Sequence, residues 1–204
     1  MLILLQVKYK TISSSLLLFA IMYLMELGLI AIGVGDNANT IFLITQFVFI
    51  PLSGFLALHL FNDLFGSDHS TFLHTFYKGK VEKIYGVYLA MYMIPLTIIC
   101  VLLHFRYGEF DIIPALILIF TQVLLFSSLS LVIFAITSDM NITITLFVLY
   151  LSVELATFGS IGNLIHIFYM NLQEPIVFST VKHMIVINFV LGIIGYRFFK
   201  TIVS

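Results

Sequence analysis

Two acidic side chains lie inside long apolar stretches of the sequence. Glu26 falls near the middle of a stretch at 14–34, and Glu154 falls in the second half of a stretch at 141–159. A charged side chain at the centre of a bilayer costs about 2.5–3.5 kcal/mol on insertion scales, so each acid should face protein or water. We expect Glu26, Glu154 and Gln46 to lie on a substrate pathway or at a subunit interface. The alternative is that the two acids are protonated or hydrogen-bonded structural groups.

Gln46 belongs to a weaker class of polar residue inside the apolar stretches, together with Gln122 and Asn188. Amide side chains at such positions form hydrogen bonds between helices more often than they bind ligands. For these amides, hydrogen bonding between helices is the simpler expectation.

Asp68, His69 and His74 are the closest approach to a metal-binding motif. The two histidines are five positions apart, about 500° around a helix, so they point in different directions. A zinc site needs three or four ligands in fixed geometry, and the single Cys100 offers no cysteine pair. We predict no metal site. The stretches also hold no G-x-S-G run, no H-E-x-x-H and no adjacent acidic pair, so we expect no enzyme.

The composition indicates whether these residues belong to a soluble protein or to a membrane protein. The chain has 204 residues, of which 61% are hydrophobic and only 9% charged, whereas a soluble domain is about a quarter charged. The net charge of −1 also lacks the basic excess of a nucleic-acid binder. An all-α polytopic membrane protein is therefore predicted.

Six apolar stretches are long enough to cross about 30 Å of hydrocarbon as helices. They form one transmembrane domain at 14–204, preceded by an N-terminal interfacial helix at 1–13, and the expected spans are 14–34, 40–61, 84–105, 111–137, 141–159 and 181–199. An outer re-entrant segment at 160–180 is broken by Glu174-Pro175, since proline disfavours helix at the preceding residue.

Basic residues set the expected orientation. With six spans both termini lie on one side, which then carries seven Lys and Arg residues against two on the other: Lys8, Lys10, Lys78, Lys80, Lys83, Arg197 and Lys200 against Arg106 and Lys182. The positive-inside rule places both termini and the loop at 62–83 in the cytoplasm.

This cytoplasmic loop contains a short amphipathic pattern. Ser67 or Asp68 suits a helix N-cap, and a group of apolar residues follows at helical spacing, with lysines just beyond: Phe72, Leu73 and Phe76, then Lys78 and Lys80. An aromatic face of this kind needs a surface to cover it. The membrane surface and a soluble partner subunit are the two candidates.

The loop and the layout of spans together resemble the membrane (permease) subunits of type-2 ABC exporters, a six-span bacterial family. Asp63, Gly66 and Ser67 resemble the start of the family's loop motif, Phe72-Leu73 its turn, and Gly86 its final glycine. Phe76 stands near the family's proline, and Val87 replaces its lysine.

The resemblance implies a division of labour between chains. Two permease subunits, a homodimer or two related chains, would form a pathway in the bacterial cell membrane for an apolar or amphipathic substrate. A separate cytoplasmic ATPase would bind ATP and Mg, and the cytoplasmic loop would be its coupling helix, with these residues in contact: Asp68, Phe72, Leu73, His74, Phe76, Lys78 and Lys80. This chain has no G-x-x-x-x-G-K-[ST] loop, so we expect it to bind no nucleotide or other cofactor itself. The alternative is the substrate-binding membrane subunit of a vitamin-uptake transporter, and an intramembrane enzyme is the less favoured third interpretation.

Overall fold

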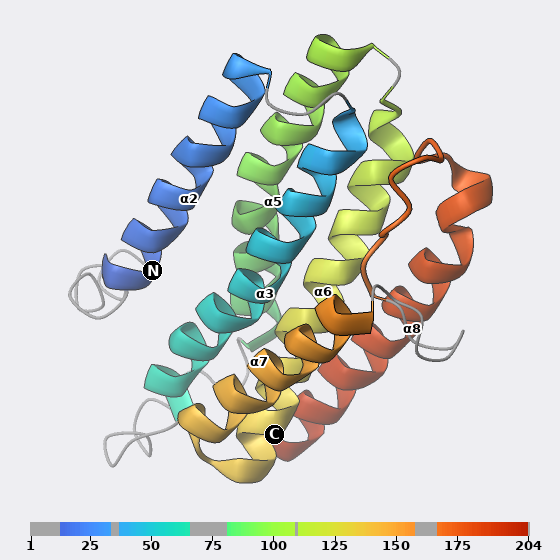
Figure 1. Ribbon diagram of the computed structural model, residues 1–204. Helices are drawn as coiled ribbons and strands as arrows, with labels where there is room; N and C mark the ends of the chain where they lie inside the picture. The colour runs from blue at the N-terminus through green and yellow to red at the C-terminus, as the bar shows by residue number, and fades with distance from the viewer. Residues whose placement is uncertain (1–12, 34–36, 66–80, 109, 158–166, 204) are drawn as a thin grey trace.

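The computed structural model describes residues 13–33, 37–65, 81–108, 110–157 and 167–203. Over these ranges the chain forms helices and no strand (Figure 1). The helices are α2 (Ser13–Ile32), α3 (Ala38–Phe65), α5 (Val81–Tyr107), α6 (Ile112–Thr137), α7 (Met140–Thr157) and α8 (Phe178–Val203).

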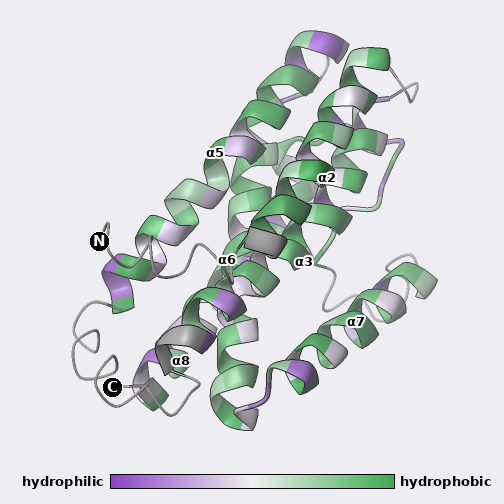
Figure 2. Cartoon of the chain, turned by 90° about the vertical axis from the view of Figure 1, so that its left-hand side faces the viewer, coloured by the Kyte–Doolittle hydropathy of each residue, from purple (hydrophilic) through white to green (hydrophobic). Residues whose placement is uncertain are grey.

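Five of these helices, α3, α5, α6, α7 and α8, are long and apolar enough to cross a membrane. The apolar part of α2, Leu16–Ile32, is shorter. In Figure 2 most of the helical ribbon has the hydrophobic colour, and the strongly hydrophilic residues lie mainly near helix ends. The chain is therefore an all-helical transmembrane protein, while its sixth crossing by α2 stays a prediction.

Local capping explains where α6 and α7 begin and end. The Asp111 carboxylate accepts a hydrogen bond from the Ile113 N–H at 3.3 Å, and Ser138 ends α6 in the left-handed conformation, with φ 53°. Asp139 then caps α7 by accepting from the Asn141 N–H at 2.7 Å. Polar residues between two apolar runs thus satisfy the free backbone groups and fix a tight turn.

Helix α6 lies at the centre of the bundle and packs against α3, α5, α7 and α8. Its contact with α8 is the closest, because Gly192 and Gly195 let the two backbones approach. A Cβ added at Gly192 would meet Leu124 Cγ at 2.9 Å and the Leu125 backbone nitrogen at 3.1 Å. Small residues at helix contacts are typical of membrane bundles. Helix α2, in contrast, packs at the edge, against α3 and α5.

The helices alternate in direction, which defines two ends of the bundle (Figure 1). We call the end where α3 and α8 finish and α5 begins the basal end, and the end where α3, α6 and α8 begin the apical end. Among the described residues, Lys83, Arg197 and Lys200 lie toward the basal end, and Arg106 and Lys182 toward the apical end.

A non-helical segment, residues 167–177, lies between α7 and α8 and runs beside the helices toward the apical end (Figure 1). We call it the outer segment. The sequence placed a re-entrant element at 160–180; α8 already begins at Phe178, and 158–166 fall outside the described residues.

Two other expected elements also fall outside the described residues. Of the interfacial helix predicted at 1–13, residues 1–12 lie outside the described residues, and Ser13 is the first residue of α2. The middle of the loop at 62–83 is likewise not described, although α3 continues to Phe65 and α5 starts at Val81. All seven predicted ATPase-coupling residues lie in that undescribed part: Asp68, Phe72, Leu73, His74, Phe76, Lys78 and Lys80.

Candidate functional site

The first turn of α3 and the residue before it hold the apical half of the outer segment. The Asn37 side chain donates a hydrogen bond to the Leu172 carbonyl at 2.7 Å, and Asn39 donates to the Glu174 carbonyl at 2.7 Å. Gln46 follows Asn39 by seven residues, so the two side chains lie on the same face of α3, about 10 Å apart along its axis. One face of α3 therefore carries a row of amides that matches the direction of the outer segment.

Gln46 pairs with the backbone of Tyr169 in the manner of a neighbouring β-strand. Its Oε1 accepts from the Tyr169 N–H at 2.8 Å, and its Nε2 donates to the Tyr169 carbonyl at 3.3 Å. The Tyr169 hydroxyl donates to the Glu174 carbonyl at 3.1 Å, and burial raises the pKa of this phenol above its ordinary value. One side-chain amide thus satisfies both the backbone N–H and the backbone carbonyl of a residue that lies outside the helices.

Three further helices supply side chains that bind the backbone of Ile167, two residues before Tyr169. Gln122 of α6 donates both to the Gln46 Oε1, at 2.7 Å, and to the Ile167 carbonyl. Asn188 of α8 donates to the same carbonyl at 3.4 Å. Glu154 of α7 accepts from the Ile167 N–H at 3.3 Å, and its second oxygen accepts from Tyr150 at 3.1 Å.

We call these side chains and the backbone groups that they bind the amide network: Gln46, Gln122, Glu154, Asn188, Ile167 and Tyr169. Gln46, Gln122 and Asn188 are fully buried, and Glu154 is 5% exposed. Gln46 lies about 12 Å along α3 from its first residue, which places this backbone inside the bundle. Because Ile167 and Tyr169 are buried, each of their backbone groups would cost several kcal/mol if it were left unpaired. The amide network therefore makes the non-helical outer segment possible.

The amide network leaves two acceptors over. Gln122 Oε1 and Asn188 Oδ1 are buried and have no hydrogen-bond partner among the described residues. Both amides already donate to the Ile167 carbonyl. Their orientation is therefore set by the demand of that carbonyl rather than by their own oxygens.

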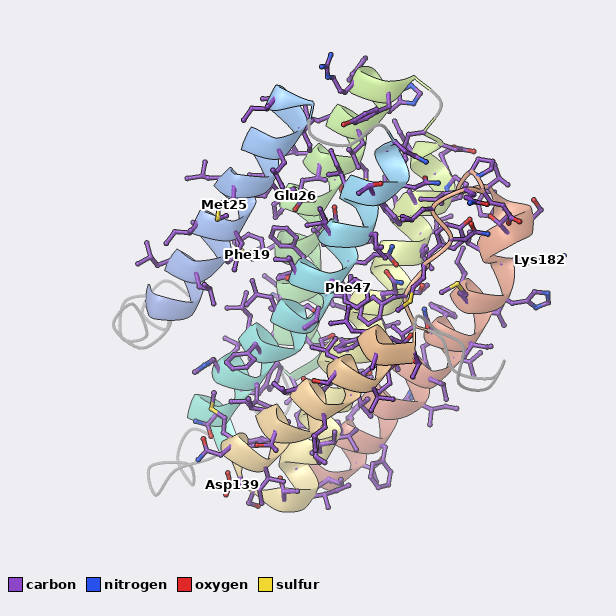
Figure 3. All side chains as sticks on the ribbon, in the orientation of Figure 1. Phe19, Met25, Glu26, Phe47, Asp139 and Lys182 are labelled. Carbon is purple, nitrogen blue, oxygen red and sulfur yellow. The ribbon has the colours of Figure 1, made fainter. Side chains whose placement is uncertain are left out.

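Glu26 forms a separate polar site between α2 and α3. Its side chain projects from α2 toward the bundle, whereas Met25 lies on the outer face (Figure 3) and is 61% exposed. The Thr45 hydroxyl donates to Glu26 Oε1, and Oε2 has no partner among the described residues. Thr45 lies also 3.0 Å from the Ile41 carbonyl, which gives its hydroxyl a second acceptor. Among the acids that the structure describes, Glu26 is the one with a buried oxygen that has no hydrogen-bond partner.

Hydrogen bonds of three tyrosine hydroxyls of α5 connect this helix to α3 and α6. Tyr92 and Tyr88 of α5 donate to the carbonyls of Phe49 and Ser53 in α3, on either side of Pro51. Tyr85 lies 2.7 Å from the Ser127 hydroxyl of α6. These bonds are structural, since each one crosses between two helices and ends on a backbone or serine oxygen.

The structure thus gives each predicted pathway or interface residue a partner inside the chain. Gln46 and Glu154 bind the outer segment, and Glu26 binds Thr45. Over the ranges that the structure describes, no group of three or more His, Cys, Asp or Glu side chains is placed to hold a metal ion. A role of Glu26, Gln46 and Glu154 in a pathway or interface stays a prediction.

Sequence reasoning missed Asn37, Asn39 and the convergence of four helices on two backbone residues. The available signal was the row of Asn37, Asn39 and Gln46 at the start of an apolar helix, next in space to a segment broken by proline. Comparison with known proteins adds no name to this arrangement. No family model, curated protein or solved structure matches the chain.

Proposed function

We propose that the chain is the transmembrane permease subunit of an ATP-driven ABC exporter. Two such subunits, identical or related, would enclose a pathway for an apolar or amphipathic molecule. A separate cytoplasmic ATPase would supply the energy by hydrolysing ATP with Mg. The order of the helices supports this, with α2 taken as the sixth crossing and with α3 ending and α5 beginning at the basal end, where α8 also ends.

The observation that carries the proposal is the outer segment held inside the bundle by the amide network. Non-helical backbone at membrane depth is tolerated only where protein buries it or where it lines a water-filled cavity. Transporters use interrupted elements of this kind close to their transport pathways. Gln46 and Glu154 would then act through the segment that they hold, which bounds the apical end of the pathway.

Charge supports an orientation with the basal end, and so both termini, in the cytoplasm of a bacterial cell. Lys83, Arg197 and Lys200 lie toward that end, against Arg106 and Lys182 at the other. By the positive-inside rule this excess belongs on the cytoplasmic side, where a soluble ATPase would also lie.

The test is capture of the ATPase by the tagged full-length chain from its native membranes. The eluate should contain a soluble subunit that photolabels with an azido-ATP, and its ATP hydrolysis should be sensitive to vanadate. Changing Phe72 and Phe76 together to Asp should remove the labelled subunit, because their rings are the predicted contact. Phe105→Asp is the matched control, since Phe105 is 80% exposed near the apical end and should not affect capture.

Two results would reject the proposal. One is a purified chain with no nucleotide-binding companion under any mild extraction. The other is full capture by the Phe72 and Phe76 double variant. Tight binding of a vitamin-sized molecule by the isolated chain would instead favour the uptake-transporter alternative.

A further inference from the structure

An open groove runs along the outer surface between α5 and α6. Its volume is about 440 Å³, and its lining is almost wholly apolar. The lining residues are Gly86, Leu89, Ala90, Met93 and Thr97 of α5, with Leu116, Ile117 and Phe120 of α6. The Thr97 hydroxyl donates to the Met93 carbonyl of its own helix at 2.8 Å, so the groove presents little free polarity.

Two small residues of α5 leave the groove open at its basal end. A Cβ at Gly86 would meet no atom within 4 Å, and Ala90 one turn further is exposed. Helix α6 reaches the groove only with its first turns, through residues such as Phe120. The groove therefore extends along α5 from Gly86 to Thr97, which suits a flexible chain.

The length of the groove matches one leaflet of a bilayer. Gly86 and Thr97 are eleven residues apart, about 16 Å along α5. The hydrocarbon core is about 30 Å thick, so each leaflet contributes about 15 Å of acyl chain. A single acyl chain entering at Gly86 would end near Thr97.

A lysine stands where the headgroup of that lipid would be. Lys83 precedes Gly86 by three residues and lies on the same face of α5 as Ala90 and Thr97, because the spacings follow the helical repeat. It is exposed and forms no ion pair with any residue that the structure describes. The neighbouring Glu82 is bound instead by Lys200 of α8.

We propose that the groove between α5 and α6 is a binding site for one acyl chain of an anionic phospholipid from the basal leaflet, with its phosphate at Lys83. The apolar strip supplies the contact for the chain, and the lysine supplies the preference for an anionic headgroup. None of the lining residues belongs to the amide network, and neither they nor Lys83 are among the predicted ATPase-coupling residues.

The experiment is native mass spectrometry of the purified full-length chain, delipidated in mild detergent and titrated with phosphatidylglycerol or phosphatidylcholine. The wild type should bind one phosphatidylglycerol in preference to phosphatidylcholine. Lys83→Gln should weaken phosphatidylglycerol binding about fivefold and leave phosphatidylcholine unchanged, as expected for the loss of one basic residue at a membrane surface. Ala90→Phe should weaken binding of both lipids, because the ring fills the groove.

Two matched controls separate the site from general surface effects. Lys182→Gln removes an exposed lysine at the apical end, and Met91→Phe enlarges an exposed side chain on another face of α5. Neither should change lipid binding. Thermal unfolding of each variant in the same detergent checks that the fold is retained.

Three outcomes would overturn the proposal. Equal binding of the two lipids with no effect of Lys83→Gln would remove the role of the lysine. Unchanged binding in Ala90→Phe would place the lipid elsewhere. A chain that is dimeric in the wild type and monomeric in Ala90→Phe would show that a helix of a second copy occupies the groove.

Discussion

Replacing Gln46, Gln122 and Asn188 one at a time by leucine should destabilise the bundle in a fixed order, Gln46 most and Asn188 least. Leucine is close to these side chains in size, so the change removes hydrogen bonds rather than volume. Gln46 takes part in three bonds, from the Tyr169 N–H, to the Tyr169 carbonyl and from Gln122. Gln122 takes part in two, and Asn188 in one, which is also the longest at 3.4 Å.

The magnitudes follow from what each variant leaves unpaired. Gln46→Leu removes the partner of the buried Tyr169 N–H, and a buried group without a partner costs about 1–3 kcal/mol, so we expect about 2–4 kcal/mol in all. Gln122→Leu leaves the Ile167 carbonyl with Asn188 and Gln46 with Tyr169, and should cost about 1–2 kcal/mol. Asn188→Leu leaves Ile167 with Gln122 and removes an unpaired buried oxygen, so its cost should lie within about 0.5 kcal/mol of zero.

The assay is reversible unfolding of the full-length chain by sodium dodecyl sulfate in mixed micelles, followed by far-ultraviolet circular dichroism. Thr145→Val on α7 is the control, because its hydroxyl is exposed and bonds only the Asn141 carbonyl of its own helix. A double-mutant cycle of Gln46 and Gln122 should show coupling, since their side chains bond directly at 2.7 Å. Equal costs in the three leucine variants, or the largest cost at Asn188, would refute the assignment of the amide network.

Two further substitutions test the packing of α8 and the isolated acid in the same unfolding assay. Gly192→Ala should cost about 1–3 kcal/mol, because its Cβ would lie 3.1 Å from the Leu125 backbone nitrogen. Gly28→Ala is the control: a Cβ there would meet no atom within 4 Å, so the change should be neutral or stabilising by up to about 1 kcal/mol. A Gly192→Ala variant as stable as the wild type would contradict the close approach of α6 and α8. Glu26→Leu should not lower the free energy of unfolding, because it removes an unpaired buried oxygen and leaves Thr45 the Ile41 carbonyl as acceptor. A loss above about 1 kcal/mol would mean that the Thr45 bond stabilises the bundle more than burying the acid costs, and loss of transport with full stability would favour a functional role for Glu26.

The helices themselves were largely predictable, because hydropathy and capping are local properties. The stretch expected at 111–137 is observed as Ile112–Thr137, with Asp111 as its N-cap. The stretch expected at 40–61 is observed as Ala38–Phe65, several residues longer. Hydropathy marks only the apolar part of a helix, while the backbone hydrogen bonds continue into its polar ends. For the same reason α8 begins at Phe178, ahead of the apolar run expected at 181–199.

The amide network was not predictable from single positions, since it depends on which turns of remote helices meet. The sequence identified Gln46, Gln122 and Asn188 as amides suited to bonds between helices, and one such bond exists, between Gln46 and Gln122. The other bonds of these amides go to the backbone of Ile167 and Tyr169. The spacing of residues in the sequence does not predict these bonds.

Counting the buried backbone groups of the outer segment that need a hydrogen-bond partner would have predicted more of the amide network. A segment that is neither helical nor solvated must find a side-chain donor or acceptor for each buried N–H and carbonyl. Apolar spans offer few such groups, and Gln46, Gln122, Glu154 and Asn188 are among them. Once proline excludes helix from part of the segment, the scarce buried amides and acids of the surrounding spans become its expected partners. On this reasoning a polar residue in a span is first a candidate for pairing with irregular backbone, and its part in a pathway follows from where that backbone lies.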